Sequence, residues 1–227
     1  MSLKNIIVAG MLSTTALMGA NAFATEAAAT SELTNFYVQL NGGASLGLAP
    51  KKDFGNKKAG TSGLYGFEAG YQFNEFFRAG LGVDYRNKYS FTQTGTDGNI
   101  TASTNWKIKS LAVMANVYFD IMEVNGFTPY VTLGGGIAKN TVSGTQTIPQ
   151  PNQPDKSDSY PKATKTNFAY KAGLGTRYHF NQNIAIDVRY QFANLGKIKS
   201  GTSEDLPVAQ NGKLRAHEFL AGISYRF

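Results

Sequence analysis

The side chains most able to carry catalysis or bind a metal are the two histidines, and their positions argue against both roles. His179 and His217 each lie in a segment whose polar and apolar residues alternate, so that neighbouring side chains face opposite sides of a strand. By this alternation His179 lies on the polar side and His217 on the apolar side. A metal pair, or a nucleophile and its base, must share one face within hydrogen-bond reach. Since the chain also has no cysteine, we predict no enzyme activity, no metal and no cofactor.

A glycine cluster suggests phosphate binding, but its surroundings do not support that role. Gly134-Gly135-Gly136 lies inside an alternating segment, and the Gly-Lys-Ser/Thr sequence that completes a phosphate-binding loop does not follow it. Glycines inside a strand usually mark a bend or a close approach of two backbones. We therefore interpret this cluster as a packing feature.

Charged residues of both signs occupy alternate positions in several segments. Opposite charges can share an enclosed interior, because each offsets the desolvation of the other. We predict structural ion pairs there, formed between an acid and an arginine within each of two groups. The first group is Glu68, Asp84, Arg78 and Arg86, and the second is Asp187, Glu218, Arg177 and Arg189.

Eight alternating segments must position these charges. One row of each segment is aliphatic and aromatic with no charge in its middle, and the other row is polar or charged. An apolar exterior around a polar interior is typical of a membrane barrel and is the reverse of a soluble one. The predicted strands are 36–48, 63–73, 77–85, 107–121, 128–138, 168–180, 184–192 and 216–227.

The connections between these strands alternate in length, which predicts the topology. Three are short, at 74–76, 122–127 and 181–183, and four are long, at 49–62, 86–106, 139–167 and 193–213. The pattern indicates an all-β fold: an eight-stranded antiparallel up-and-down transmembrane β-barrel with four long extracellular loops and short periplasmic turns. Within the third long connection, Thr145–Thr166 is rich in Pro, Ser, Asn and Gln. We expect it to be mobile and to lack a packed core of its own.

The first 24 residues have the features of a secretory signal peptide. Lys4 supplies the positive start, residues 6–20 are apolar, and Ala22-Phe23-Ala24 provides a small-x-small cleavage site. We expect residues 25–35 to form a short periplasmic lead and residues 36–227 to form the barrel domain.

The long connections are rich in lysine. They contain twelve lysines and six acidic residues. The whole chain has a net charge of +7, which falls to +6 when Lys4 is removed with the signal peptide. The net positive charge therefore lies on the predicted outer rim. It predicts an electrostatic docking surface for acidic partners, with lysines that only keep the loops soluble as the alternative. The candidate ligand-binding residues are Lys51, Lys52, Lys57, Lys58, Lys88, Lys156, Lys162, Lys165, Lys197 and Lys199.

Three motifs carry a resemblance to a known family. The start FYVQLNGGAS, the segment PYVTLGGG and the end AHEFLAGISYRF are similar to the eight-stranded outer-membrane barrels that include OmpX, Ail, the Opa proteins and the OmpA transmembrane domain. Among these, the chain most resembles small adhesin-like proteins of obligate intracellular bacteria. The resemblance implies that Tyr225 and Phe227 form the signal read by the barrel-insertion machinery. It also implies adhesion through extracellular loops, without assigning any contact residue.

We therefore expect a surface protein of the bacterial outer membrane, with extracellular loops and periplasmic termini. It would act as an adhesin, binding host-cell surface proteins, serum proteins or glycosaminoglycans. Outer-membrane lipids, lipopolysaccharide and the insertion machinery are the other expected partners, and nucleic acid is not. The alternatives are a structural barrel that stabilises the lipid leaflet and a narrow, low-conductance pore.

Overall fold

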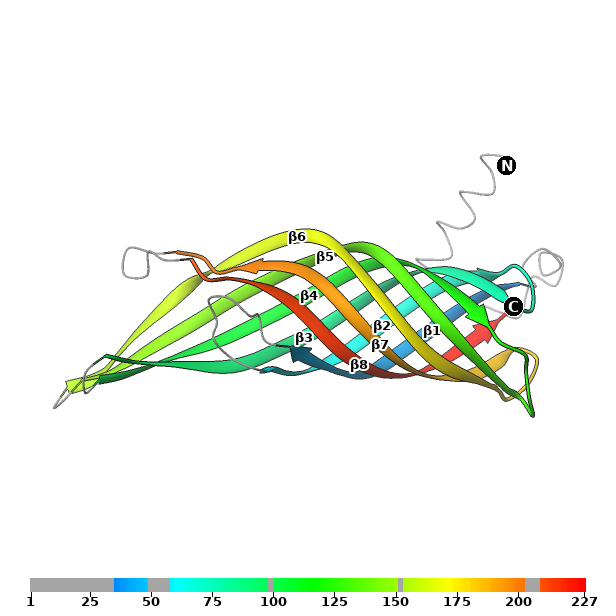
Figure 1. Cartoon of the computed structure of the whole chain (residues 1–227), viewed down its shortest axis with the longest axis horizontal. Coiled ribbons are helices and arrows are strands. Elements are labelled where there is room, and N and C mark those ends of the chain that lie inside the picture. Colours follow the sequence, from blue (N-terminus) through cyan, green and yellow to red (C-terminus); the bar gives the residue numbers. More distant parts are fainter. Residues whose placement is uncertain (1–34, 49–57, 98–99, 151–152, 203–208) are drawn as a thin grey trace, which may run out of the picture. The chain divides into compact units, whose positions relative to one another are not determined.

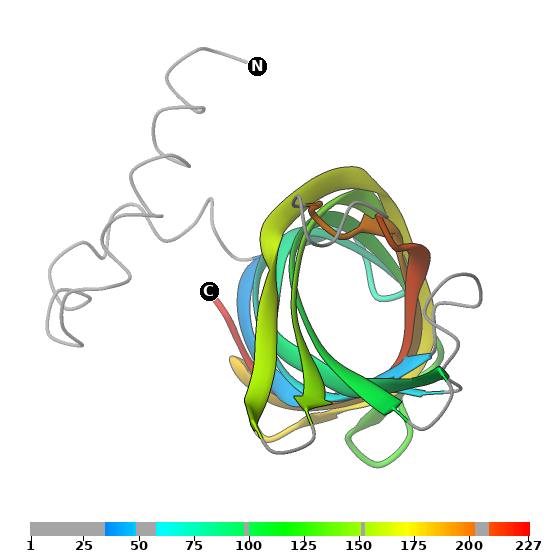
Figure 2. The ribbon, with the colours of Figure 1, turned by 90° about the vertical axis from the view of Figure 1, so that its left-hand side faces the viewer.

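Eight antiparallel strands close into a barrel in which sequence neighbours pair and the first strand also pairs with the last (Figures 1 and 2). This computed structural model describes residues 35–48, 58–97, 100–150, 153–202 and 209–227. The strands are β1 (Phe36–Leu48), β2 (Lys58–Gln72), β3 (Phe77–Asp97), β4 (Ile100–Asp120), β5 (Phe127–Gln150), β6 (Gln153–His179), β7 (Ile184–Lys199) and β8 (Asn211–Arg226). The predicted fold class is confirmed, whereas the predicted signal peptide and all of the lead except Asn35 lie outside the described residues.

The short turns lie where the sequence predicts them, and asparagine stabilises each one. Asn74 Oδ1 accepts a hydrogen bond from the backbone N–H of Phe76, and Asn181 Oδ1 accepts one from Asn183. Between β4 and β5, Asn125 and Gly126 both have positive φ, at 52° and 82°. Asparagine and glycine tolerate this left-handed backbone better than other residues.

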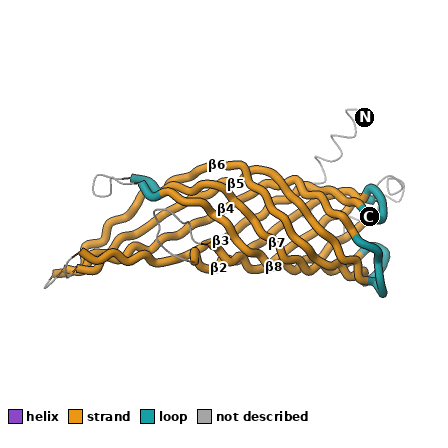
Figure 3. Tube along the Cα trace, viewed as in Figure 1, coloured by secondary structure: helices purple, strands orange, loops and turns teal. Residues whose placement is uncertain are grey.

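On the side away from these turns, β2 to β8 continue beyond their predicted ends, and β3, β5 and β6 continue furthest (Figure 3). β3 and β4 stay paired out to Asp97 and Ile100, and β5 and β6 out to Gln150 and Gln153. The assignment of Thr145–Thr166 to a loop is wrong, because most of this segment belongs to the β5–β6 hairpin, whereas its expected mobility stays a prediction. Its sequence is polar, but threonine is β-branched and suits an extended backbone. Backbone pairing can therefore order a segment that has little apolar surface.

On the turn side, the barrel has the predicted distribution of polarity. Outward side chains are exposed and apolar, such as Leu81 at 65%, Leu133 at 62% and Phe168 at 71%. The charged residues that alternate with them are buried inside. This arrangement fits a wall surrounded by lipid. Among the residues that the structure describes, none forms a helix long and apolar enough to cross a membrane.

On the opposite side, the polarity of the wall is reversed. A cluster of buried apolar residues fills the interior between the extended strands, and Lys107, Lys109 and Lys139 face outward. The change is visible within β3, where a bulge between Arg86 and Tyr89 separates charged from aromatic inward residues. The cluster, which we call the outer core, consists of Tyr89, Phe91, Trp106, Ile108, Ala112, Met114, Ala138, Val142, Ala169, Ala193, Leu195, Ile198 and Leu214.

Candidate functional site

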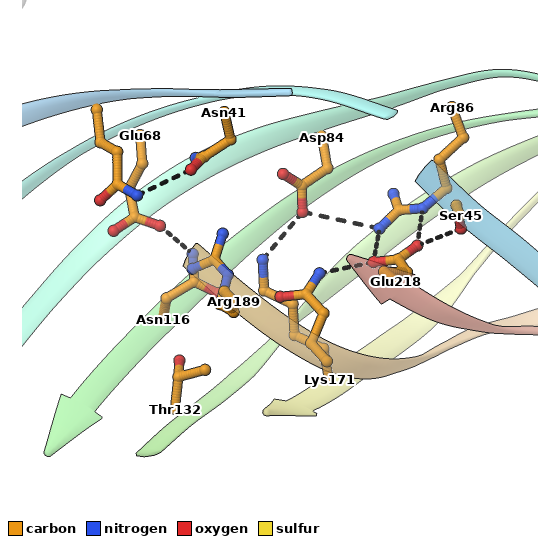
Figure 4. A network of polar contacts seen from close by, with 12 residues as sticks. Asn41, Ser45, Glu68, Asp84, Arg86, Asn116, Thr132, Lys171, Arg189 and Glu218 are labelled. Carbon is orange, nitrogen blue, oxygen red and sulfur yellow. Dashed lines mark hydrogen bonds and ion pairs between the residues drawn. The ribbon is translucent and has the colours of Figure 1, made fainter. Parts of the chain in front are cut away.

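The interior of the turn-side half is organised around Glu218 on β8 (Figure 4). Its carboxylate accepts hydrogen bonds from Arg86 on β3 through Nε at 2.6 Å and Nη2 at 3.0 Å. Gln191 Nε2 donates at 2.6 Å and Ser45 Oγ at 2.7 Å. Glu218 has no exposed surface, so its charge is satisfied entirely by protein groups from three other strands, β1, β3 and β7.

Three further ion pairs lie inside the barrel, and Arg86 joins one of them to Glu218. Lys171 Nζ lies 2.9 Å from Asp84 Oδ2, and Arg86 Nη2 lies 3.8 Å from the same oxygen. Arg78 donates from Nε and Nη2 to the two carboxylate oxygens of Asp120, at 2.6 and 2.9 Å. Such a bidentate geometry fixes both side chains. Lys171 and Asp120 were not among the residues for which the sequence predicted ion pairs.

Only one of the predicted pairings, Asp84 with Arg86, occurs as an ion pair among the described residues. Glu68 instead accepts from Tyr37, Asn116 and Tyr118 at 2.6 to 2.7 Å, and Asp187 accepts from the hydroxyl of Tyr130. The two remaining arginines also bond to neutral groups: Arg177 Nη2 donates to Gln39 and Arg189 Nη1 donates to Tyr118. Pairing across the interior depends on strand stagger, which sequence spacing does not reveal. Tyrosine side chains are long enough to reach Glu68 and Asp187 across the interior. They take the place of the arginines that the sequence predicted as partners.

Neither histidine takes part in the ion pairs described above. His217 is on the outward face of β8, where its Nδ1 and the hydroxyl of Tyr190 are 2.7 Å apart. His179 lies at the turn-side end of β6, opposite Ala185. Within the described ranges, no group of three or more His, Asp or Glu side chains could hold a metal ion. The buried polar groups therefore fill and brace the interior.

The candidate ligand-binding lysines lie on the extended strands. Lys51, Lys52 and Lys57 fall outside the described residues, and the side chain of Lys58 does too. The others are exposed and belong to strands that had been predicted as loops. They are Lys88 on β3, Lys156, Lys162 and Lys165 on β6, and Lys197 and Lys199 on β7.

The outer core holds the β5–β6 hairpin that carries three of these lysines. Tyr160 on β6 packs against Trp106 on β4 with ring centroids 4.7 Å apart, and partial burial raises the pKa of its hydroxyl. The backbone of Gly144 passes directly beside the same indole, where a Cβ atom would come within 2.7 Å of the ring. Sequence reasoning missed this anchor. The sequence did contain a pattern that could have revealed it. Trp106, Ile108 and Ala112 are apolar at even positions, whereas the predicted apolar row of this strand, which includes Leu111, occupies odd positions.

At the turn side, the last two aromatic residues contact the first strand and each other. The backbone N–H of Phe227 donates to Phe36 O at 3.0 Å, and the Tyr225 and Phe227 rings meet edge to face at 5.2 Å. Tyr225 is 45% exposed on the outer wall. This position suits an interfacial aromatic belt, while the role of Tyr225 and Phe227 as an insertion signal stays a prediction.

Comparison with known proteins identifies relatives of the same architecture. A family model described as the outer membrane protein beta-barrel domain matches residues 13–227. Outer membrane protein PagN of Salmonella typhimurium is 33% identical over 126 residues, 53% of this chain and 51% of PagN, so the match spans about half of that relative. A Rickettsia conorii protein named "Putative adhesin RC1281" is 26% identical over 220 residues, 88% of this chain and 86% of that protein.

The solved structures agree on the fold. Neisserial surface protein A has a TM-score of 0.51 and 17% identity, and the alignment covers 85% of this chain and 97% of that one.

Proposed function

The chain belongs to the outer membrane protein β-barrel family, and we propose that it is an adhesin whose extended strands bind acidic groups on host cells. The family places the barrel in the bacterial outer membrane. The half with the short turns then faces the periplasm, and the extended half faces outward. The proposed binding surface is the basic β5–β6 hairpin.

The observation that carries this proposal is an ordered, lysine-bearing hairpin that packs against the outer core through Tyr160. Lys156, Lys162 and Lys165 are exposed along β6, and Tyr160 between them is fixed on Trp106. An ordered surface loses less conformational entropy on binding than a free loop does. Lysines without arginine favour attraction to diffuse negative charge over recognition of one shape. Sulfated or carboxylated glycans, and acidic protein surfaces, have that chemistry.

The relatives support the same class of function. The name of the Rickettsia conorii relative denotes an adhesin, and its match covers most of both chains. The match to PagN supports the outer-membrane location. Neither relative assigns a ligand or a contact residue to this chain.

The test is attachment of bacteria that display the protein to host cells, with heparin as a soluble competitor. Replacing Lys156, Lys162 and Lys165 by Gln should lower attachment about tenfold and weaken its dependence on salt, because these charges attract the partner. The matched control replaces Lys107, Lys109 and Lys139, which are also exposed, with the same loss of charge. Equal loss in both variants would contradict a binding surface on β6, and unchanged attachment in both would contradict adhesion through charge.

The lumen gives no support to the pore alternative. Arg78, Arg86 and Arg189 are fully buried across the inner half, and Trp106 and Ile108 close the outer half. An eight-stranded barrel has an interior that side chains can fill. Planar-bilayer conductance tests this point, and steady single-channel currents from the purified barrel would favour the pore.

A further inference from the structure

A cluster of positive charges lies on the outer wall at the extracellular ends of β7 and β8. Lys197 and Lys213 are directly opposite each other in the β7–β8 register, and both are exposed. Lys199 lies two residues after Lys197 on the same face. Arg215 lies two residues before His217 in the outward row of β8, opposite Asn194. Like charges in directly opposite positions destabilise a sheet. The arrangement favours an anion between the two strands.

These charges lack protein partners among the residues that the structure describes. The salt bridges found there do not include Lys197, Lys199, Lys213 or Arg215. The Nε atom of Arg215 is buried and has no hydrogen-bond partner. Glu204 and Asp205, in the connection between β7 and β8, lie outside the described residues.

An aromatic shelf lies directly below this basic cluster on the same two strands. Tyr190 and His217 are hydrogen bonded and their rings are nearly parallel, with an interplanar angle of 13°. Phe192 and Phe219 pack beside them with ring centroids 5.6 Å from His217 and 5.2 Å from Tyr190, respectively. Rings with an apolar body and a polar edge are favoured where hydrocarbon meets head groups. The shelf therefore marks the outer membrane interface.

Below the shelf, the wall is hollowed. An open depression of about 620 Å³ is lined by residues of β1, β6, β7 and β8, among them the small residues Gly42 and Ala221, which are directly paired. Leu174, Val188 and Phe219 form its apolar sides. Ala221 lies six residues from Arg215, about 20 Å along the strand at about 3.3 Å per residue. Because barrel strands are tilted, this length corresponds to a depth of about 15 Å, half of the hydrocarbon core.

We propose that this face of β7 and β8 binds one phosphorylated lipid of the outer leaflet. The phosphate lies between Lys197 and Lys213, with Lys199 and Arg215 around it. The sugar or glycerol backbone rests on the Tyr190–His217 shelf, and one acyl chain enters the depression at Ala221. The order of basic, aromatic and apolar surfaces along the wall matches the order of groups in an amphiphilic anion, which a soluble glycan or an acidic peptide does not reproduce. This site is separate from the proposed adhesive hairpin and goes beyond that function.

The test measures lipid binding to the refolded mature barrel by native mass spectrometry. The probe is lipid A carrying its phosphates, compared with the same lipid after dephosphorylation. Lys197→Gln with Lys213→Gln should weaken binding of the phosphorylated lipid about thirtyfold. This is the factor for two basic contacts of about 1 kcal/mol each, at about 1.4 kcal/mol per tenfold. Binding of the dephosphorylated lipid should not change.

Two control variants make the result specific. Lys107→Gln with Lys109→Gln removes the same charge from the outward face of β4, and should change binding less than about threefold. Ala221→Phe fills the depression and should weaken binding of both lipids, whereas Ala115→Phe adds the same bulk to the outward face of β4 and should not. Each variant is checked for the gel-mobility shift of a folded barrel.

Equal losses in the two lysine variants, or inorganic phosphate competing as well as the lipid does, would overturn the proposed site. Unchanged binding in Ala221→Phe would overturn the acyl-chain position. Because this readout contains no host component, its failure is distinguishable from a failure of the adhesion proposal.

Discussion

The two halves of this barrel use the same eight strands with opposite polarity. In the membrane half, the outward residues are apolar, and the interior holds buried ions such as Arg86 and Glu218. In the extracellular half, the interior holds Trp106 and Ile108, and the outward residues are lysine and threonine. The solvent outside each half decides which row of an alternating strand faces inward. A single chain can therefore build a lipid-facing wall and a water-facing wall without changing strands.

The difference has energetic consequences. Buried charges depend on their partners, because a lone ion inside a protein is far less stable than a paired one. An apolar core depends on the area removed from water and tolerates loss of one contact more gradually. We expect the membrane half to respond most strongly to loss of a charge partner, and the extracellular half to tolerate new charges on its surface.

The largest expected effect is removal of the charge on Glu218. Glu218→Gln leaves the guanidinium of Arg86 without its bidentate partner, and breaking a buried pair costs about 3 to 5 kcal/mol. Urea unfolding of the refolded barrel in lipid vesicles measures this loss. The matched control is Glu75→Gln in an exposed turn, which should stay within about 0.5 kcal/mol of the parent. Similar stability of the two variants would show that the ionic interior is not coupled to folding.

A smaller effect should separate the two outward faces directly. Leu81→Lys places a cation in the middle of the lipid-facing wall, which costs about 2 to 4 kcal/mol. Thr94→Lys makes the same addition on an exposed position of the extended half of β3, where surface changes cost about 0.5 kcal/mol or less. Unfolding free energies in vesicles compare them. A comparable cost at both positions would mean that the lipid boundary lies further out than Arg86 and Tyr89.

Sequence reasoning predicted the faces of the strands better than their lengths or their contacts. The inward positions of Glu68, Arg78 and Glu218 follow from local alternation, which needs no knowledge of the fold. Their partners do not, because Glu218 on β8 meets Arg86 on β3 across the interior. That meeting depends on the tilt and stagger of the closed sheet.

The extended strands escaped prediction for a different reason. Beyond the membrane the apolar row changes from outward to inward, so a rule that seeks an apolar exterior ends the strands too early. Trp106 then appears to be a loop residue, although it continues the alternation of Ile108 with Lys107 and Lys109 in a regular strand. A search that accepts an apolar row on either face of the strand would have found these extensions. The proposed ligands of the lysines could not be predicted in this way, because they belong to other molecules.

The reversal of polarity is tested most directly by the accessibility of neighbouring positions on β4. The chain has no cysteine, so single cysteines can be introduced at Ile108 and Lys109 and labelled on intact cells with a membrane-impermeant maleimide. We predict rapid labelling at Lys109, which faces water, and slow labelling at Ile108, which lies in the outer core. Equal rapid labelling at both positions would contradict a packed extracellular half.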